Sequence, residues 1–204
     1  MMTEKEKMLA GKLYDPFTED MPALRHKAHE LCRQYNLLDE SDPARAEILR
    51  ELIPDNNGVY LQGPVWFDYG CLTSFGKNCY ANFNFTVLDA CPIRIGDNVF
   101  FGPNVTLVTP VHPFLPAERN QFECPDGRMT DLEYAKPLVI GSDCWIAASV
   151  TVTGGVTIGE GCVIGAGSVV TRDIPAHSFA AGVPCRVIRP ITEADSVRLK
   201  KELF

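Results

Sequence analysis

Apolar residues recur every six positions along most of this chain, and the pattern is clearest from Ile140 to Pro175. That stretch divides into IGSDCW, IAASVT, VTGGVT, IGEGCV, IGAGSV and VTRDIP, so an aliphatic residue opens each hexad and a small residue usually stands four places later. A period of six fits neither the 3.6-residue turn of an α-helix nor the simple alternation of a strand. It is typical of a parallel β-helix, in which each hexad supplies a short strand and a corner.

Two earlier sets of hexads extend the pattern towards the N-terminus. They open at Ile95, Phe101 and Leu107, and at Phe75, Ala81 and Val87. A two-residue slip separates the second set from Phe67. Three hexads close one triangular coil, so residues eighteen apart should stack about 4.8 Å from one another. We therefore expect an all-β core, a left-handed parallel β-helix over residues 59–190, with Cys144 beside Cys162 in its interior.

Helical patterns flank the repeats and predict a helical cap over residues 1–58. Thr3 and Glu6 form a capping box for a first short helix. A second helix is indicated by apolar residues at helical spacing: Leu24, Ala28, Leu31 and Tyr35. Asp42-Pro43 begins a further helix that ends before Pro54. These helices should cover one end of the prism, and residues 191–204 should form a short C-terminal helix.

The repeats are interrupted once, over residues 108–138, where prolines stand at 110, 113, 116, 125 and 137. A connection this long in a compact domain is usually functional. The period resumes cleanly at Ile140, so we interpret the interruption as an inserted functional loop. His112 lies at its base, in the text VTPVHP.

Composition and charge narrow the partners that this fold can have. The 26 acidic residues outnumber the 19 basic ones, and the pI is about 5.1. Binding to a phosphate backbone needs a basic face, so no nucleic-acid partner is expected. The longest apolar runs fall well short of the ~20 residues that span a bilayer. The N-terminal MMTEKEKMLAGK lacks the apolar core of a signal peptide, so we expect a cytoplasmic protein without a membrane partner.

The eight cysteines do not indicate a metal site. No two of them have C-x-x-C spacing, so we expect neither zinc nor another metal. In the absence of an export signal, we interpret them as reduced thiols rather than as a disulfide framework.

Three stretches together resemble the hexapeptide-repeat sugar O-acetyltransferases, which include maltose, galactoside and nodulation acetyltransferases. They are ANFNFTVLDACPIRIGDNV, VTPVHP and the segment that runs from EYAKPLVIG to GVPCRVIR. The opening KEKMLAGKLYDP is similar to the family's N-terminal segment, so the resemblance covers nearly the whole chain. It implies acetyl-CoA as donor, a sugar hydroxyl as acceptor and a homotrimer with sites between subunits. LDACP looks closer to the maltose branch, because the galactoside branch has a further acidic residue where this chain has Ala90.

His112 is the strongest catalytic candidate. The family's catalytic histidine stands in a T-x-x-H-P context, which Thr109 to Pro113 matches. A sugar hydroxyl is a poor nucleophile at neutral pH, and a general base with a pKa near 7 supplies what the reaction lacks. The alternative is that His112 only forms hydrogen bonds within its loop. The other three histidines are interpreted as ordinary surface or turn residues: His26, His29 and His177.

The resemblance also implies residues for the acceptor and for the reacting carbonyl. It assigns a backbone N–H at Ala148 to the oxyanion of the tetrahedral intermediate, and Asn82 to substrate binding and transition-state support. The alternative for Asn82 is a polar corner residue. Further acceptor-binding residues are implied, together with His112, at Arg25, Asp68 and Asp89. An acidic position of the family falls on Pro16, one place from Asp15.

A basic segment near the C-terminus is the candidate site for the phosphates of CoA. The resemblance assigns Thr171, Arg172, Arg186 and Arg189 to the nucleotide end and Ala166 to the pantetheine channel. The alternative is that these cations are solvated surface residues.

One segment of the chain departs from the family's pattern, and three rival functions were weighed. The segment 119–137 is longer than the family's usual connection, which leaves the identity of the sugar open. A γ-type carbonic anhydrase has the same prism but needs three metal-binding histidines, and only His112 and His177 lie in or after the repeats. The remaining rivals are a catalytically silent assembly protein and an acetyltransferase for an amine, an antibiotic or an amino acid.

Overall fold

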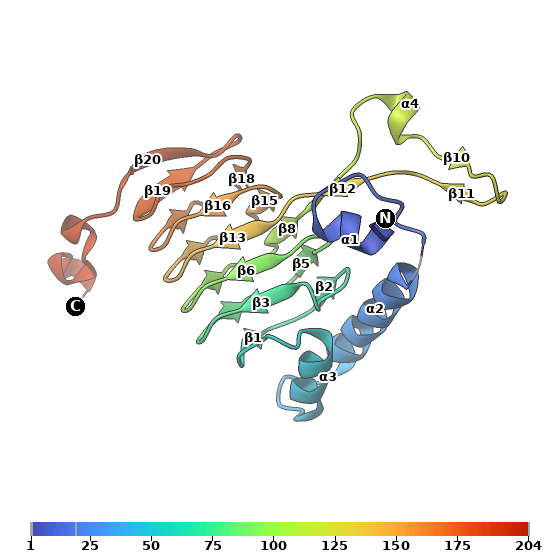
Figure 1. Cartoon of the computed structure of the whole chain (residues 1–204). Helices are drawn as coiled ribbons and strands as arrows, with labels where there is room; N and C mark the ends of the chain where they lie inside the picture. The colour runs from blue at the N-terminus through green and yellow to red at the C-terminus, as the bar shows by residue number, and fades with distance from the viewer. Residues whose placement is uncertain (1, 19, 204) are drawn as a thin grey trace.

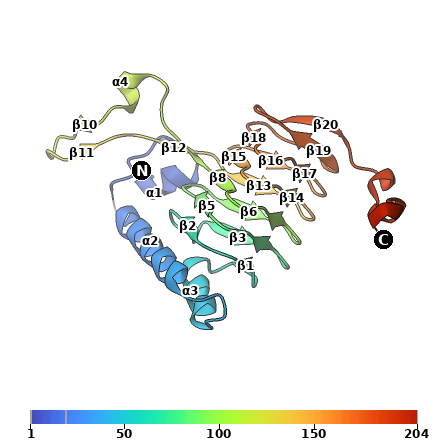
Figure 2. The ribbon, with the colours of Figure 1, turned by 180° about the vertical axis from the view of Figure 1, so that it is seen from behind.

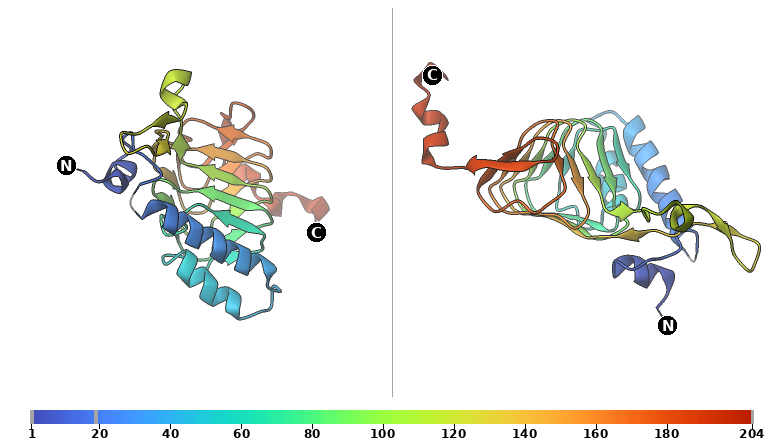
Figure 3. Two further views of the ribbon diagram at one scale, coloured as in Figure 1. Left: turned by 90° about the vertical axis from the view of Figure 1, so that its right-hand side faces the viewer. Right: turned by 90° about the horizontal axis from the view of Figure 1, so that it is seen from above.

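The computed structural model describes residues 2–18 and 20–203. Three helices precede the repeats: α1 (Glu4–Leu9), α2 (Met21–Leu37) and α3 (Ala44–Leu52). The strands that follow wind into a triangular prism whose three sides are parallel sheets, with one antiparallel strand at the C-terminal edge (Figures 1 and 3). The parallel β-helix that the hexads predict is therefore confirmed.

Each side of the prism is a sheet whose strands come from successive coils. The first sheet, in spatial order, contains β1 (Tyr60–Leu61), β4 (Tyr80–Ala81), β7 (Phe100–Phe101), β14 (Trp145–Ile146), β17 (Val163–Ile164), β19 (Ser178–Ala181) and β20 (Arg186–Pro190). The second contains β18 (Val169–Val170), β15 (Thr151–Thr153), β8 (Thr106–Val108), β5 (Phe85–Leu88) and β2 (Val65–Phe67). The third contains β16 (Thr157–Ile158), β13 (Leu138–Ile140), β6 (Ile93–Ile95) and β3 (Thr73–Phe75).

The coils are not all of one length. In the C-terminal coils Trp145 pairs with Val163, which is the expected spacing of eighteen. In the N-terminal coils Tyr60 pairs with Tyr80, a spacing of twenty. The expectation of a uniform eighteen-residue coil was therefore wrong for the N-terminal part. The two additional residues lie at the corner between the second and third sheets, where the spacing from Val87 to Ile95 is eight instead of six.

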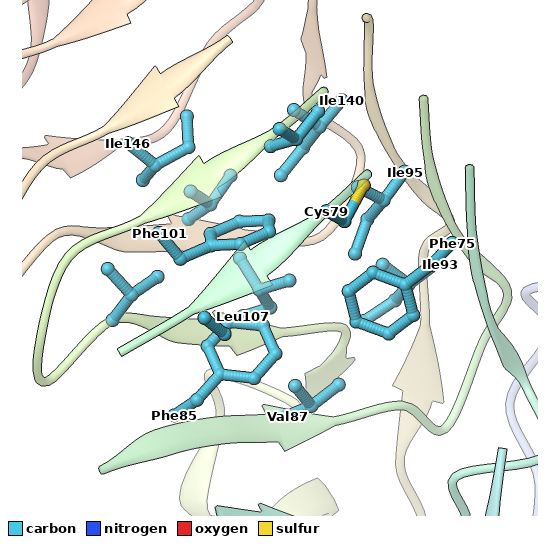
Figure 4. Close-up of a cluster of buried hydrophobic side chains, with 14 of the residues drawn as sticks. Phe75, Cys79, Phe85, Val87, Ile93, Ile95, Phe101, Leu107, Ile140 and Ile146 are labelled. Carbon is cyan, nitrogen blue, oxygen red and sulfur yellow. The ribbon is translucent and has the colours of Figure 1, made fainter. Parts of the chain in front are cut away.

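The interior of the prism is a single apolar column (Figure 4). The rings of Phe85 and Phe101 lie 4.9 Å apart at its centre, and both side chains are almost completely buried. Cys144 and Cys162 are also buried, and each thiol donates to a corner carbonyl oxygen at 3.1 Å. Burial raises the pKa of Cys144 to about 12, so the thiol stays protonated and fills space, as the hexad register predicted.

Asparagines stabilise the corners by stacking along the edges of the prism. Asn78 and Asn98 adopt positive φ, which Asn tolerates better than most residues. The amide of Asn78 donates to Asn98 Oδ1 at 3.1 Å, and that of Asn98 donates to Asp143 Oδ1 at 2.8 Å. A second ladder joins Asn84 to Asn104. Successive corners are thus joined by side chains as well as by the strand ladder.

The N-terminal helices divide into two groups. The capping box at Thr3 is present. Helices α2 and α3 pack together at the β1–β3 end of the prism, as a cap (Figure 2). There the hydroxyl of Tyr35 donates to Leu61 O at 2.6 Å. Helix α1 instead packs beside the base of the inserted loop, in a small apolar cluster with Tyr14 and Ala135. Only α2 and α3 therefore cover the end of the prism.

The inserted loop is an arm with its own short elements. It contains β9 (Pro110–Val111), α4 (Pro116–Arg119), β10 (Phe122–Glu123), β11 (Met129–Thr130) and β12 (Tyr134–Ala135). Strands β9 and β12 form an antiparallel ribbon at its base, and α4, β10 and β11 project beyond the prism (Figure 1).

The C-terminal tail begins after the β19–β20 hairpin. It forms three short 3₁₀ helices, η1 (Glu193–Asp195), η2 (Val197–Leu199) and η3 (Lys201–Leu203), instead of one continuous helix. Ser196 interrupts the helix, because its backbone, with φ −58° and ψ 125°, is not helical. Among the described residues, none of the helices combines the length and the apolar character that a membrane crossing requires.

Candidate active site

His112 is placed by the point at which the chain leaves the prism. Thr109, the last residue of the coil before the inserted loop, is completely buried. Its hydroxyl donates to Leu88 O at 2.8 Å and accepts from Cys91 N at 3.0 Å. These bonds fix the start of the β9–β12 ribbon to the neighbouring coil. His112 follows β9 directly, and 53% of its side chain is exposed. The threonine of the T-x-x-H-P text is thus the anchor of the ribbon.

Glu133 lies opposite His112 at the end of this ribbon. The distance from His112 Nε2 to Glu133 Oε2 is 3.8 Å, and only 14% of the Glu133 side chain is exposed. The other carboxylate oxygen accepts a short hydrogen bond from the hydroxyl of Tyr14. Tyr14 and Glu133 also exchange backbone hydrogen bonds of 2.9 and 3.2 Å. The sequence analysis missed both residues as members of the site. The only indication in the sequence was that Glu133 is the first residue of the EYAKP segment that resembles the family.

Arg25 forms part of the N-terminal side of the site. Its guanidinium donates to the hydroxyl of Tyr69 at 2.8 Å and to Pro16 O at 2.9 Å. It also lies 5.7 Å from the ring centre of Phe17. Burial raises the pKa of Tyr69, while the positive charge of Arg25 acts in the opposite direction. Arg25, which the resemblance implied for substrate binding, therefore lies on the edge of the prism that carries the His112 ribbon.

Asp15 holds the arm against the N-terminal segment. Its carboxylate accepts from Arg128 Nη2 at 2.8 Å and from Thr130 Oγ1 at 2.6 Å. Burial acts to raise the pKa of Asp15, but the hydrogen bonds from Arg128 and Thr130 outweigh it and hold the pKa below its usual value. The carboxylate next to Pro16 is therefore engaged in fixing the arm.

Asp89 is inside the wide corner of its coil. No part of its surface is exposed. Its oxygens accept from Tyr69 N at 2.8 Å, from Gly70 N at 3.2 Å and from Thr73 Oγ1 at 2.9 Å. Burial raises the pKa of Asp89 to about 6. The sequence analysis assigned Asp89 to the acceptor, but in this structure the carboxylate is enclosed by the corner that it holds together.

Asp68 lies one coil below, at the same edge of the prism. Its Oδ1 is 3.4 Å from Nε2 of His29, and the two side chains line a shallow cavity of about 320 Å³ with Arg33 and Trp66. Asp68 is thus accessible, in contrast to Asp89. His29, which was interpreted as an ordinary surface residue, is its neighbour.

Other residues implied for catalysis and for CoA binding lie at a different edge. Asn82, Ala148 and Ala166 occupy corners between the first and second sheets, and the corner at Gly102 lies between those of Asn82 and Ala148. The Asn82 Oδ1 atom accepts from Phe83 N at 2.8 Å, which is the behaviour of a corner asparagine. The strands of the second sheet separate this edge from His112 by roughly 15 Å, at ~3.3 Å per residue. One chain alone therefore does not bring Asn82 and His112 together.

The residues implied for the phosphates of CoA lie at two separate places on the prism. Thr171 and Arg172 follow β18, at the edge that carries His112, and both are exposed. Arg186 and Arg189 lie on β20. Arg189 forms a two-point ion pair with Asp195 at 2.6 and 2.8 Å, and these hydrogen bonds lower the pKa of Asp195 to about 2. Arg186 has no carboxylate partner within the described part of the chain.

An apolar groove of about 590 Å³ adjoins the His112 loop. It is lined mainly by Leu13, Pro113, Phe114, Leu115, Phe122 and Tyr134. Within residues 2–18 and 20–203, no three His, Cys, Asp or Glu side chains gather as a metal ion would require. The chemistry that the His112 edge offers is a partly exposed imidazole beside a buried carboxylate, which suits proton transfer.

Comparison with known proteins connects this geometry to one group of enzymes. Residues 7–55 match the maltose acetyltransferase hexapeptide capping motif, and residues 137–172 match the bacterial transferase hexapeptide. The galactoside O-acetyltransferase of Escherichia coli (strain K12) is 40% identical over 95% of this chain and 92% of its own length.

Two solved structures extend the likeness to three dimensions. The maltose O-acetyltransferase of Clostridium difficile 630 is 42% identical, with a TM-score of 0.86 over 94% of this chain and 99% of that one. A hexapeptide-repeat acetyltransferase of Vibrio cholerae O1 biovar eltor, solved with acetyl coenzyme A, is 33% identical, with a TM-score of 0.80 over 94% of this chain and 100% of that one.

The burial of Asp89 predicts a pH-dependent contribution to stability. Its pKa of about 6 lies above the ~3.9 of an unfolded chain, so its contribution is complete below pH ~4 and is lost as the pH rises through 6. Asp89→Asn should remove this dependence. Between pH 4.5 and 7 the free energy of unfolding of the wild type should therefore fall by about 1–3 kcal/mol relative to the variant. Denaturant unfolding at the two pH values measures the difference.

Asp55→Asn, the same substitution at an exposed position, is the matched control for the loss of one carboxylate, and it should alter the difference between the two pH values less than Asp89→Asn does. If Asp89→Asn kept the wild-type dependence on pH and instead raised the KM for the acceptor, Asp89 would be a substrate-binding residue after all.

Proposed function

The chain belongs to the hexapeptide-repeat acetyltransferase family of the galactoside and maltose O-acetyltransferases, and from this membership we propose that it transfers an acetyl group from acetyl-CoA to a sugar hydroxyl. The observation that carries the proposal is His112, a half-exposed imidazole anchored to the prism by Thr109. The relative from Clostridium difficile favours a maltose- or glucose-like acceptor.

His112 acts as general base on the acceptor. One ring nitrogen takes the proton of the sugar hydroxyl while the hydroxyl oxygen attacks the thioester carbonyl carbon of acetyl-CoA. The tetrahedral intermediate carries a negative oxygen, to which the backbone N–H of Ala148 donates, and Asn82 supports the same state. The intermediate then expels the CoA thiolate, which receives the proton held by His112. The products are the acetylated sugar and free CoA.

The active enzyme is a homotrimer, because the proposed residues lie at two edges of one prism. A second copy that packs with its Asn82 edge against the His112 edge of the first would complete each site, and a three-fold ring closes this arrangement. An aromatic row in register on the outer surface of the first sheet supports contact between copies: Tyr60, Phe100 and Trp145 are exposed, and the half-buried Tyr80 lies between Tyr60 and Phe100. Exposed aromatic side chains that adjoin one another in this way are typical of an interface.

Acetyl-CoA binds along the C-terminal coils of the prism. Arg172 and Arg186 are exposed cations that can meet the phosphates of the nucleotide end. Arg189 reaches a phosphate only if it leaves Asp195. Thr171 lies beside Arg172, and Ala166, at a corner followed by Gly167, is small enough to border the pantetheine arm.

Replacement of His112 tests the proposed chemistry. His112→Ala should lower kcat by roughly 10²–10⁴, because the ring assists the transition state and contributes little to ground-state binding. The KM for acetyl-CoA, the trimer and the melting temperature should stay near the wild-type values. His26→Ala, on the exposed face of α2, serves as the control. Near-normal kcat in a folded His112→Ala trimer would exclude His112 as the base.

Mixed trimers test whether each site draws residues from two chains. His112→Ala and Asn82→Ala should each be nearly inactive as homotrimers. In co-expressed mixed trimers, about one third of the sites should combine an intact His112 with an intact Asn82, so activity should return. Measuring kcat of the purified mixed species decides the question. Mixed trimers as inactive as their parents would place both residues in a site within one chain.

Arg186→Ala tests the donor site. Loss of a charge-assisted contact of about 1–3 kcal/mol should raise the KM for acetyl-CoA between several-fold and about a hundredfold, and change the KM for the sugar much less. Arg94→Ala, an exposed arginine on the outer surface of the third sheet, is the matched control. An unchanged donor KM in Arg186→Ala would mean that Arg186 is an ordinary surface cation.

A further inference from the structure

We propose that a cavity between the helical cap and the first coil binds a small polyhydroxylated oxyanion, such as a sugar-alcohol phosphate or a sugar acid. The cavity has a volume of about 530 Å³ and lies between the start of α3 and β1, the edge strand of the first sheet (Figure 1). His112 leaves the prism at another edge and from a later coil. Binding in this cavity is therefore separate from the proposed acetyl transfer.

Arg45, in the first turn of α3, is a buried cation that lines this cavity. The residue is 7% exposed. Its Nη2 donates to Leu61 O at 2.9 Å and to Gln62 O at 3.0 Å, and its guanidinium lies 4.2 Å from the ring centre of Tyr35. In the described part of the chain it forms no ion pair with a carboxylate. A buried charge without a counter-ion is costly, so an anion beside Arg45 would stabilise the cap.

The Nε–H group of Arg45 is a second, independent indication of a ligand. Of the buried side-chain nitrogen and oxygen atoms within residues 2–18 and 20–203, it alone has no hydrogen-bond partner. Buried donors in native proteins nearly always have one, and each exception needs an explanation. The protein by itself thus satisfies neither the charge nor all the donors of Arg45. An oxyanion supplies both a negative charge and several acceptor oxygens, and it can bind two N–H groups of a guanidinium at once.

Arg50 brings a second cation to the same cavity. Its side chain is exposed, and among the described residues it has no carboxylate partner within ion-pair distance. Two guanidinium groups that line one cavity and are both without an ion pair favour an anionic ligand over a neutral one. Because Arg50 is exposed and Arg45 is buried, an anion that enters from solvent meets Arg50 first.

Two carboxylates on the α2–α3 connection determine what the rest of the ligand carries. Glu40 accepts a short hydrogen bond from Gln62 Nε2, and Asp42 Oδ1 accepts from Ala44 N at 2.9 Å. Both residues line the cavity. Their negative charge repels an oxyanion, which therefore belongs at the arginines, whereas hydroxyl groups can donate to the carboxylates. A bare anion would use only the arginines, and a neutral sugar only the carboxylates.

The size and the apolar part of the cavity fit a ligand with a carbon chain. Small-molecule sites usually have volumes of ~300–1,000 Å³, and this cavity lies in that range. The buried Leu49 and Val59 supply apolar surface to it. An inorganic anion would leave most of this space unfilled, so we infer a ligand of several carbon atoms.

Titration calorimetry of the intact protein tests the site with sorbitol 6-phosphate, gluconate, sorbitol and inorganic phosphate. None of these probes is a pyranose, so none resembles an acceptor for the His112 edge. We expect saturable binding of sorbitol 6-phosphate, of gluconate or of both, at one molecule per chain. Sorbitol and inorganic phosphate should bind much more weakly. The tighter of the two polyhydroxylated anions identifies the oxyanion as a phosphate or a carboxylate.

The variants remove the two cations separately. Arg50→Gln leaves the hydrogen bonds of Arg45 intact and should weaken binding about tenfold, through the loss of one charge-assisted contact. Arg45→Gln should weaken binding by more than that and also lower the melting temperature, because it loses the bonds to Leu61 O and Gln62 O. Neither substitution should alter kcat. Arg94→Gln, at an exposed position on the third sheet, is the matched control and should bind the probe as the wild type does.

Arg186→Ala distinguishes this cavity from the proposed CoA site, where a phosphate probe would also bind. Binding that is weakened in Arg50→Gln but kept in Arg94→Gln and Arg186→Ala would support the cavity as the site. The absence of saturable binding of either polyhydroxylated anion, or wild-type affinity in a folded Arg50→Gln, would overturn the proposal and make Arg45 only a tie between cap and coil. Inorganic phosphate that binds as tightly as sorbitol 6-phosphate would overturn the role of the carboxylates. Sugar acetylation, measured on the same samples, decides the proposed function separately.

Discussion

The hydrogen-bonded stacking of one coil on the next is the constraint on which this structure depends. Because each strand pairs in register with the coils on either side, a residue's place in its hexad decides whether it faces the core, a corner or the solvent. Two additional residues at one corner of the N-terminal coils alter that register locally. Asp89 fills the widened corner with a carboxylate that accepts from two backbone N–H groups. The arm that carries His112 leaves from this same corner one coil later.

The sequence was sufficient for the features that depend on short-range periodicity. The hexads from Ile140 onwards predicted the prism, and Thr3 with Glu6 predicted the capping box of α1. It was insufficient where the interaction joins distant segments. Tyr14 and Glu133 are 119 positions apart, and only the packing of the N-terminal segment against the ribbon brings them together. The burial of Asp89 could not be predicted either, because a single sequence does not distinguish a carboxylate inside a wide corner from one at its surface.

The division of the candidate residues between two edges connects the fold to its proposed activity. Each corner of a coil lies at a separate edge of the triangular prism. Because a strand of the second sheet separates the two edges, Asn82 and His112 cannot meet within one chain. Under the proposed function, assembly is part of catalysis, since a neighbouring copy supplies the oxyanion donor and the carbonyl end of acetyl-CoA. In the same proposal the His112 edge supplies the base, and the Glu133 carboxylate and Arg25 lie at that edge. This distribution explains why the strongest local chemistry lies on an arm anchored at Thr109 and Asp15 rather than inside the prism.

The central claim is that this chain acetylates a sugar hydroxyl with acetyl-CoA. Release of free CoA thiol, measured with glucose, maltose, galactosides and chito-oligosaccharides as acceptors, tests it most directly, with mass and ester analysis of the isolated sugar. The account predicts thiol release that depends on one class of sugar and an O-linked acetyl ester in equal amount. Thiol release no faster than in the absence of acceptor across the whole panel, or an acetyl group found only on an amine acceptor, would contradict it.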